Sequence, residues 1–307
     1  MQRSWESCFG AAAMIGEAAA IGSAVAFGVS TVLARRFMEA IPPESGVLVS
    51  IATNVVVFTA IAAATALRGA IPPIHPASIP LFILGGVAGS LVGRNLSYLS
   101  LERLGAPLST TIRLSAVAFT LLFGLVFLKE FPRAWQLLGL TIITIGLGIC
   151  VRSRDRGGPP GRSGSVGSGF LLALAGGAGF AVGDTVRRGA LVLTPAPVLG
   201  AAVGACAALT GHLLWSRIRI SARWPTGPSL RRPDLLGSAI FNTIAILLLF
   251  VALSRAPVAI VSVLYNLQVL VVFIISPLAL RGQEPITAWL VVGTALALAG
   301  TTMILTG

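Results

Sequence analysis

The chain has 307 residues, of which 55% are hydrophobic and only 10% are charged, and its formal net charge is +12. So few polar residues cannot cover the surface of a water-soluble globule, and the mean hydropathy of +0.92 indicates an integral membrane protein. The positive charge lies in short arginine clusters between apolar segments, such as RSRDR at 152–156. This pattern is typical of membrane flanks, so we predict no nucleic-acid partner.

Ten apolar segments follow one another along the chain, each long enough to cross a hydrocarbon layer about 30 Å thick as a helix. The sixth ends before Arg187 and Arg188, which we interpret as residues of the membrane flank. We predict transmembrane helices at 11–34, 45–67, 79–101, 107–128, 134–151, 168–186, 197–215, 234–253, 257–280 and 285–306.

The second half of the chain repeats the first. At an offset of 152 residues Arg35 aligns with Arg187, and at an offset of 154 Glu130 aligns with Glu284. Both glutamates begin the same pattern, E-x3-A-W-x3-G. Each half holds five predicted helices, and because five is odd, the second half must enter the membrane from the opposite side.

The predicted fold class is therefore an all-α integral membrane protein with ten transmembrane helices arranged as two inverted five-helix repeats. We expect the first repeat at 1–151 and the second at 168–307. The segment between them, 152–167, is rich in Gly, Ser and Arg, which is typical of a flexible linker.

The order of features within each half resembles the EamA family of the drug/metabolite transporter superfamily, over nearly the whole chain. An apolar fourth helix ends in an acidic residue, in FLKE at Glu130 and RGQE at Glu284, and a Trp and a Gly then open a fifth helix. The resemblance implies ten helices, export or exchange of small metabolites, and no ATP-hydrolysing domain. Members of the family often carry a Pro inside the fourth helix, whereas this chain reads RLSAVAF at 113–119, so the backbone break otherwise expected there lacks its usual cause.

Polar side chains inside the apolar helices are the candidate substrate-binding residues. An ionised side chain is costly in lipid, so we interpret Arg113 in the fourth helix as facing the space between the halves. The alternative is an arginine that extends to the headgroups. Arg94, one helix earlier, has the same two interpretations, and Asn95 and Tyr98 follow it with further hydrogen-bonding groups.

In the second half, Tyr265 takes the place of Arg113 within the segment VLYNLQVLV at 263–271. Tyr265, Asn266 and Gln268 would leave unsatisfied groups in lipid, so we predict that they face a binding site. Hydrogen bonding between helices is the alternative role for them. Asn242 in the eighth predicted helix is a weaker companion.

Glu17 and Asp184 are the acidic residues within predicted helices and away from their ends. A carboxyl group in a cavity can carry protons, so both are candidates for a coupling role. The alternatives are an interfacial position for Glu17 and an ion pair of Asp184 with Arg187 or Arg188. We interpret Glu130 and Glu284 as caps for the helix that follows each of them.

No cofactor, metal site or catalytic centre is predicted, because the cysteines and histidines lie far apart and no paired acids occur. The predicted function is secondary transport of a small polar or amphipathic metabolite, as an exporter or exchanger. The alternative is a membrane enzyme or scaffold without transport activity. Expected partners are the small-molecule substrate and membrane lipid, with a homodimer left open.

We expect a multi-pass protein of the cell membrane of a prokaryote. The two signals for orientation disagree. More basic residues lie on the side opposite the termini, which by the positive-inside rule places the termini outside the cytoplasm. The family resemblance implies cytoplasmic termini.

Overall fold

The computed structural model describes residues 2–70, 72–128, 134–155, 166–218, 230–280, 284 and 286–306. In this part of the chain the regular structure is helical, without strands. The helices of the first half are α1 (Gln2–Phe37), α2 (Pro43–Leu67), α3 (Ser78–Gly85), the π-helix η1 (Gly86–Gly93), α4 (Arg94–Leu104), α5 (Ala106–Ile112), α6 (Ser115–Leu128) and α7 (Ala134–Asp155). Those of the second half are α8 (Val166–Leu193), α9 (Pro197–Ile218), α11 (Pro233–Arg255), α12 (Val258–Asn266), α13 (Gln268–Ala279) and α14 (Ala288–Thr306).

The membrane class predicted from composition agrees with these helices. Within the described ranges, nine helical stretches are long and apolar enough to cross a bilayer, and the apolar part of α14, Ala288–Ile304, is shorter. The third predicted span is built from α3, η1 and α4, the fourth from α5 and α6, and the ninth from α12 and α13. The protein is therefore an all-helical, multi-pass membrane protein.

The predicted end of the sixth span is wrong. The helix α8 continues to Leu193, so Arg187 and Arg188 lie inside it and not on its flank. Arg187 is only 3% exposed, because its side chain enters a space above η1. A Cβ atom on Gly89 would come within 2.7 Å of Arg187 Nη2, so a glycine at this position makes the space available.

Both predicted fourth spans of the repeats are interrupted. In the first, Arg113 and Leu114 separate α5 from α6, and the Leu114 N–H donates to the Thr111 carbonyl at 3.0 Å. In the second, Leu267 separates α12 from α13 and its N–H donates to the Leu264 carbonyl at 3.2 Å. These bonds join residues three apart, so each span tightens locally, without a proline at the break.

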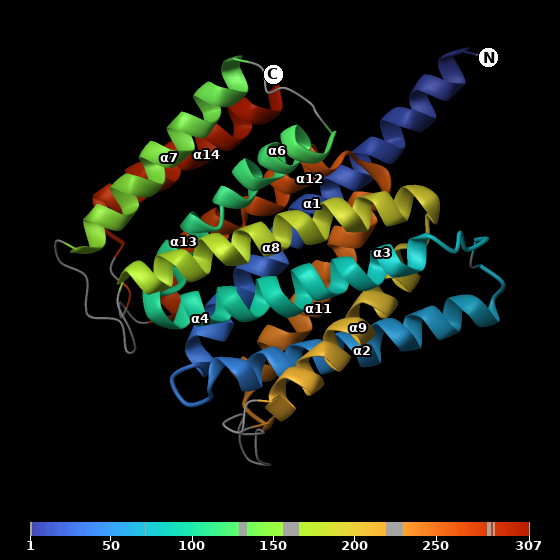
Figure 1. The fold of residues 1–307 in the computed structure, drawn as a ribbon, viewed down its shortest axis with the longest axis horizontal. Coiled ribbons are helices and arrows are strands. Elements are labelled where there is room, and N and C mark those ends of the chain that lie inside the picture. The colour runs from blue at the N-terminus through green and yellow to red at the C-terminus, as the bar shows by residue number, and fades with distance from the viewer. Residues whose placement is uncertain are drawn as a thin grey trace.

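Helices from the two halves pack on each other in a reciprocal pattern (Figure 1). The first helix of each half packs against the third span of the other, since α1 contacts α11 and α8 contacts α3, η1 and α4. The second helices, α2 and α9, pack together, and so do the last helices, α7 and α14. In Figure 1 the α7–α14 pair forms one edge of the molecule and the α2–α9 pair lies at the opposite edge.

Glycines bring α7 and α14 into backbone contact. A Cβ atom on Gly139 would lie 2.7 Å from the Gly300 carbonyl oxygen, and one on Gly146 would lie 2.5 Å from that of Gly293. The beginning of each helix therefore meets the end of the other, and the pair is antiparallel. Small residues that let backbones approach closely are a common basis of helix association in membranes.

This contact predicts opposite effects for two neighbouring Gly→Ala substitutions in α7. Gly146→Ala should destabilise the protein by about 1–3 kcal/mol, because the new methyl group overlaps the α14 backbone. Gly148 has open space at its Cβ position, so Gly148→Ala should stabilise the helix by about 0.4–1 kcal/mol. Melting temperatures in one detergent measure the difference. Equal melting temperatures for the two variants would contradict the glycine contact.

Candidate functional site

A small, largely enclosed cavity lies between the two halves of the chain. The centre of a water molecule can occupy about 10 Å³ of this cavity, which is enough room for about one water. Both repeats line it, and three of its side chains are arginines. The lining residues are Phe27, Ser90, Arg94 and Arg113 from the first half and Phe180, Asp184, Arg187, Ile246, Leu249 and Tyr265 from the second.

Arg187 and Asp184 form the ion pair of the cavity. They lie one turn apart on α8, and Arg187 Nη1 donates to Asp184 Oδ1 at 2.8 Å. Arg187 Nη2 donates to Ser90 Oγ of η1 at 2.9 Å, and its guanidinium lies 5.4 Å from the centre of the Phe250 ring. The pair therefore ties α8 to the third span of the first half. It is one of the two alternatives that the sequence left open for Asp184, and a proton-carrying role stays a prediction.

Arg94 is held by a short chain of hydrogen bonds. Its Nη1 donates to Ser50 Oγ of α2 at 2.8 Å, and that hydroxyl donates to Asn242 Oδ1 of α11 at 3.2 Å. Arg94 is 3% exposed, and among the described residues it forms no ion pair. The Arg94 guanidinium is thus buried, and its hydrogen-bond partner in the described structure is neutral.

Arg113 occupies the break between α5 and α6. Its guanidinium lies over the Phe180 ring of α8, 5.2 Å from the ring centre, in a cation–π arrangement. Its Nη2 is buried and has no hydrogen-bond partner in the described structure. Across the repeat, the Tyr265 ring packs on Phe27 of α1 with centres 6.1 Å apart. The two residues that align at offset 152, Arg113 and Tyr265, therefore line the same cavity from opposite halves.

The structure thus brings Arg94, Arg113, Asp184 and Tyr265 together and connects Asn242 to them through Ser50. The other predicted site residues lie outside the cavity lining. They are Asn95, whose amide donates to the Leu91 carbonyl; Tyr98, which packs on Phe37; Asn266, whose amide donates to the Ser262 carbonyl; Gln268, buried with neither amide atom partnered among the described residues; and Glu17, exposed on α1.

Several lining residues were not predicted from the sequence. Ser90, Phe27 and Phe180 carry no signal of their own in apolar helices, where serine and phenylalanine are common. Arg187 did carry one, because an aspartate lies three residues before it and its repeat partner is also an arginine. The position was missed because the predicted span ended at residue 186, whereas α8 continues to Leu193.

Glu284, which precedes α14, connects the end of α1 to the start of α5 at one end of the molecule. Its Oε2 accepts the Ala106 N–H at the start of α5 at 2.8 Å, and its Oε1 accepts Arg35 Nε from the end of α1. Gly105, at φ +83°, turns the chain from α4 into α5 so closely around this carboxylate that a Cβ would lie 2.8 Å from Oε1. The prediction that Glu284 caps the helix after it is wrong, since Thr287 Oγ1 accepts the Leu290 N–H in that role. Glu130 lies outside the described residues.

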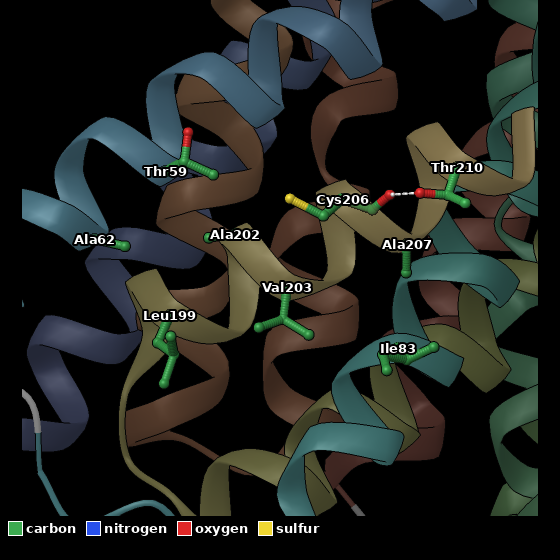
Figure 2. A pocket seen from close by; sticks show the side chains of 9 residues that line it. All are labelled: Thr59, Ala62, Ile83, Leu199, Ala202, Val203, Cys206, Ala207 and Thr210. Atoms are coloured by element: carbon green, nitrogen blue, oxygen red, sulfur yellow. Dashed lines mark hydrogen bonds between the residues drawn. The ribbon is translucent and has the colours of Figure 1, made fainter. Parts of the chain in front are cut away.

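A second, larger hollow is a surface feature of a different kind (Figure 2). It measures about 470 Å³ and is lined mainly by apolar side chains of α2, α3 and α9. Its hydroxyls, on Thr59 and Thr210, donate to carbonyls of their own helices. An open apolar surface whose hydroxyls are bonded within their own helices offers little to a polar ligand, so the small charged cavity is the candidate functional site.

Comparison with known proteins identifies the class. The sequence profile of the EamA-like transporter family matches residues 14–152 and again 167–306, which together span most of the chain. The protein belongs to the EamA-like transporter family. It is accordingly a membrane transporter, and membership in a family of transporters agrees with the prediction that it is not an enzyme.

Two further comparisons bear on the fold. No curated protein matches the sequence significantly. Among 28 matching chains of solved structures, one described only as the crystal structure of a protein shares 17% identity, covers 96% of each chain and gives a TM-score of 0.64. At this identity the likeness extends to the fold alone.

Two Asp–Arg pairs in the described part of the second half predict very different effects of neutralising the acid. Asp184→Asn leaves a buried cation without its partner and should destabilise the protein by about 3–5 kcal/mol. Asp234 pairs with Arg232, which is 38% exposed, so Asp234→Asn should change stability by about 0–1 kcal/mol. Thermal unfolding of both variants in detergent gives the comparison. If Asp234→Asn lowered the melting temperature as much as Asp184→Asn, the structural role of the Asp184–Arg187 pair would be refuted.

Proposed function

We propose that the protein is a secondary transporter that moves a small polar or amphipathic metabolite by alternating access, as an exporter or exchanger. The observation that carries the proposal is the cavity between the halves, to which both repeats contribute side chains. Secondary transporters of repeated architecture commonly bind their substrates at the interface between the repeats. Only about one water fits the cavity, so it must widen on one side to admit a substrate.

An inverted relation of the two repeats is supported by the way equivalent helices meet. Gly139 and Gly146 align with Gly293 and Gly300 at offset 154, and each contacts the non-equivalent partner, Gly300 or Gly293. Such an exchanged contact between antiparallel helices is what a two-fold axis perpendicular to both produces. If α7 and α14 run across the bilayer, this axis lies in the membrane plane, as it does in inverted-repeat transporters.

The helix breaks supply positions at which the cavity can open. Arg113 lies in one break, and Tyr265 lies two residues before the other, at Leu267. Discontinuous helices near the midplane are a recurring feature of transporter sites. A tilt of α6 relative to α5, or of α13 relative to α12, would therefore move a cavity residue directly. Because each half has such a break, the cavity could open by a helix tilt in either half.

The contacts of Glu284 with Arg35 and Ala106, here called the Glu284 junction, would close one end of the route by which a substrate reaches the cavity. The carboxylate holds α1, through Arg35, to the first turn of α5, and Arg113 lies at the other end of that short helix. Ser109 lies between the two, one turn before Arg113, and is buried. Opening toward this end would require Glu284 to release Arg35 or α5.

This junction predicts the effect of two Glu284 substitutions on access to the cavity. A cysteine at Ser109, in a chain with its native cysteines replaced by alanine, should react slowly with a water-soluble maleimide. Glu284→Ala should raise the reaction rate about 10-fold or more, because charge-assisted bonds of about 1.5–3 kcal/mol to both Arg35 and α5 are lost. Glu284→Gln keeps an acceptor for the Ala106 N–H and should give an intermediate rate. Unchanged rates in both variants would exclude the junction as a closure.

Transport itself is tested with purified protein in liposomes and a panel of labelled metabolites. We expect saturable uptake without ATP for at least one compound, and counterflow when the same compound is loaded inside. Arg113→Ala should abolish this uptake, whereas Thr210→Ala in the apolar hollow should leave it unchanged. Absence of uptake and counterflow for the whole panel would favour a membrane enzyme or scaffold over the transporter.

A further inference from the structure

The charges that line the central cavity do not balance. Three guanidinium groups, those of Arg94, Arg113 and Arg187, face it with one carboxylate, that of Asp184. Asp184 is bonded to Arg187, and among the described residues neither Arg94 nor Arg113 forms an ion pair. Because all three arginines line one small cavity, their like charges repel one another. A buried excess of positive charge is unfavourable unless a partner of opposite sign compensates it.

The hydrogen-bond donors around the first helix break are also incompletely used. Arg113 Nη2 is buried without an acceptor among the described residues, and so is the Ser115 hydroxyl at the first position of α6. The start of α6 carries the positive end of its helix dipole in the same place. An oxyanion could accept from the free guanidinium nitrogen and interact favourably with this helix end.

The remaining lining is aromatic and aliphatic. Phe180 covers the Arg113 guanidinium, while Phe27, Ile246 and Leu249 line other parts of the cavity. An apolar wall beside the arginines favours a ligand with a short carbon skeleton next to its charged group. Water is largely excluded, which strengthens each charge interaction with such a ligand.

From this charge excess and the unused donors we propose that the transported substrate is a small organic anion, whose carboxylate or phosphate group binds between Arg113 and Arg94. The proposal rests on the proposed function, since it names the substrate class of the same site. Asp184 then has a selective role as well as a structural one. It neutralises Arg187 and leaves two cationic groups for a ligand with one or two negative charges.

A series of four-carbon compounds isolates charge from size. Succinate carries two negative charges, succinamide none, 4-aminobutyrate one of each sign, and putrescine two positive charges. Binding is measured as the shift of melting temperature and by calorimetry on the purified full chain, with inorganic phosphate and a phosphate monoester, glycerol 3-phosphate, as a second arm. We expect succinate or a phosphate compound to bind at least 10-fold more tightly than succinamide and putrescine. The stronger arm identifies the carboxylate or the phosphate.

Two arginine variants show whether the binding uses the cavity. Arg113→Gln should weaken anion binding about 10- to 100-fold, as expected for the loss of charge-assisted hydrogen bonds, without lowering the melting temperature of the ligand-free protein. Arg188→Gln is the matched control, because Arg188 is the neighbour of Arg187 on α8 but donates to the Leu253 carbonyl outside the cavity. It should leave anion binding unchanged.

The outcomes separate the substrate class from transport. Anion binding without flux in liposomes would uphold the anion site and overturn the transport function. Flux of neutral or cationic compounds that outcompete the anions would uphold transport and overturn the substrate class. The anion proposal also fails if no anion binds, or if Arg113→Gln and Arg188→Gln weaken anion binding equally.

Discussion

The central constraint on this structure is the burial of charged groups inside a protein whose outer surface faces hydrocarbon. The ion pair between Arg187 and Asp184 is the interaction on which the surrounding arrangement depends. A guanidinium can lie there only if its donors find acceptors and its bulk finds room. Asp184 and Ser90 supply the acceptors, and Gly89 supplies the room. The glycine-rich π-helix η1 and the Arg187–Asp184 ion pair therefore depend on each other.

The same constraint explains why small residues are concentrated between α8 and the third span of the first half. Backbones must approach closely for a side chain from one helix to reach past the next. A Cβ on Gly183 of α8 would lie 2.8 Å from the Gly89 Cα, so the two helices are in direct contact. This close approach sets the depth at which Arg187 enters. Larger residues here would separate the helices and leave Arg187 and Ser90 too far apart to bond.

Much of the fold could be predicted from the sequence, because bilayer thickness and hydrophobicity act on continuous segments. The ends and interruptions of helices were harder, because they depend on single contacts between distant residues. The sequence placed Arg187 on a membrane flank, whereas in the structure it is buried and bonds Asp184 and Ser90. The break at Arg113 has no proline to reveal it. Local propensity does not report such tertiary effects.

The candidate site was predictable where a single residue was costly in lipid, and less so where the environment satisfied it. Arg94 and Arg113 were predicted as site residues because an arginine in an apolar helix is too costly to face lipid. Asn266 had the same appearance in the sequence, yet its amide bonds the Ser262 carbonyl within its own helix turn. Ser50 and Phe180 were missed because their importance comes entirely from the arginines that they contact.

The two halves share a backbone plan but use equivalent positions for different purposes. Arg35 and Arg187 align at offset 152, yet Arg35 joins Glu284 at one end of the molecule while Arg187 points into the central cavity. Arg113 and Tyr265 also align, and only one of them is charged. Under the proposed alternating-access mechanism, a symmetric backbone would let each half adopt the conformation of the other, which would give two access states of similar energy. The asymmetric side chains would then decide which state is favoured. The Glu284 carboxylate at one end of the molecule, and a cationic cavity to which the halves contribute unequally, would give the proposed exchange between those states a preferred resting position.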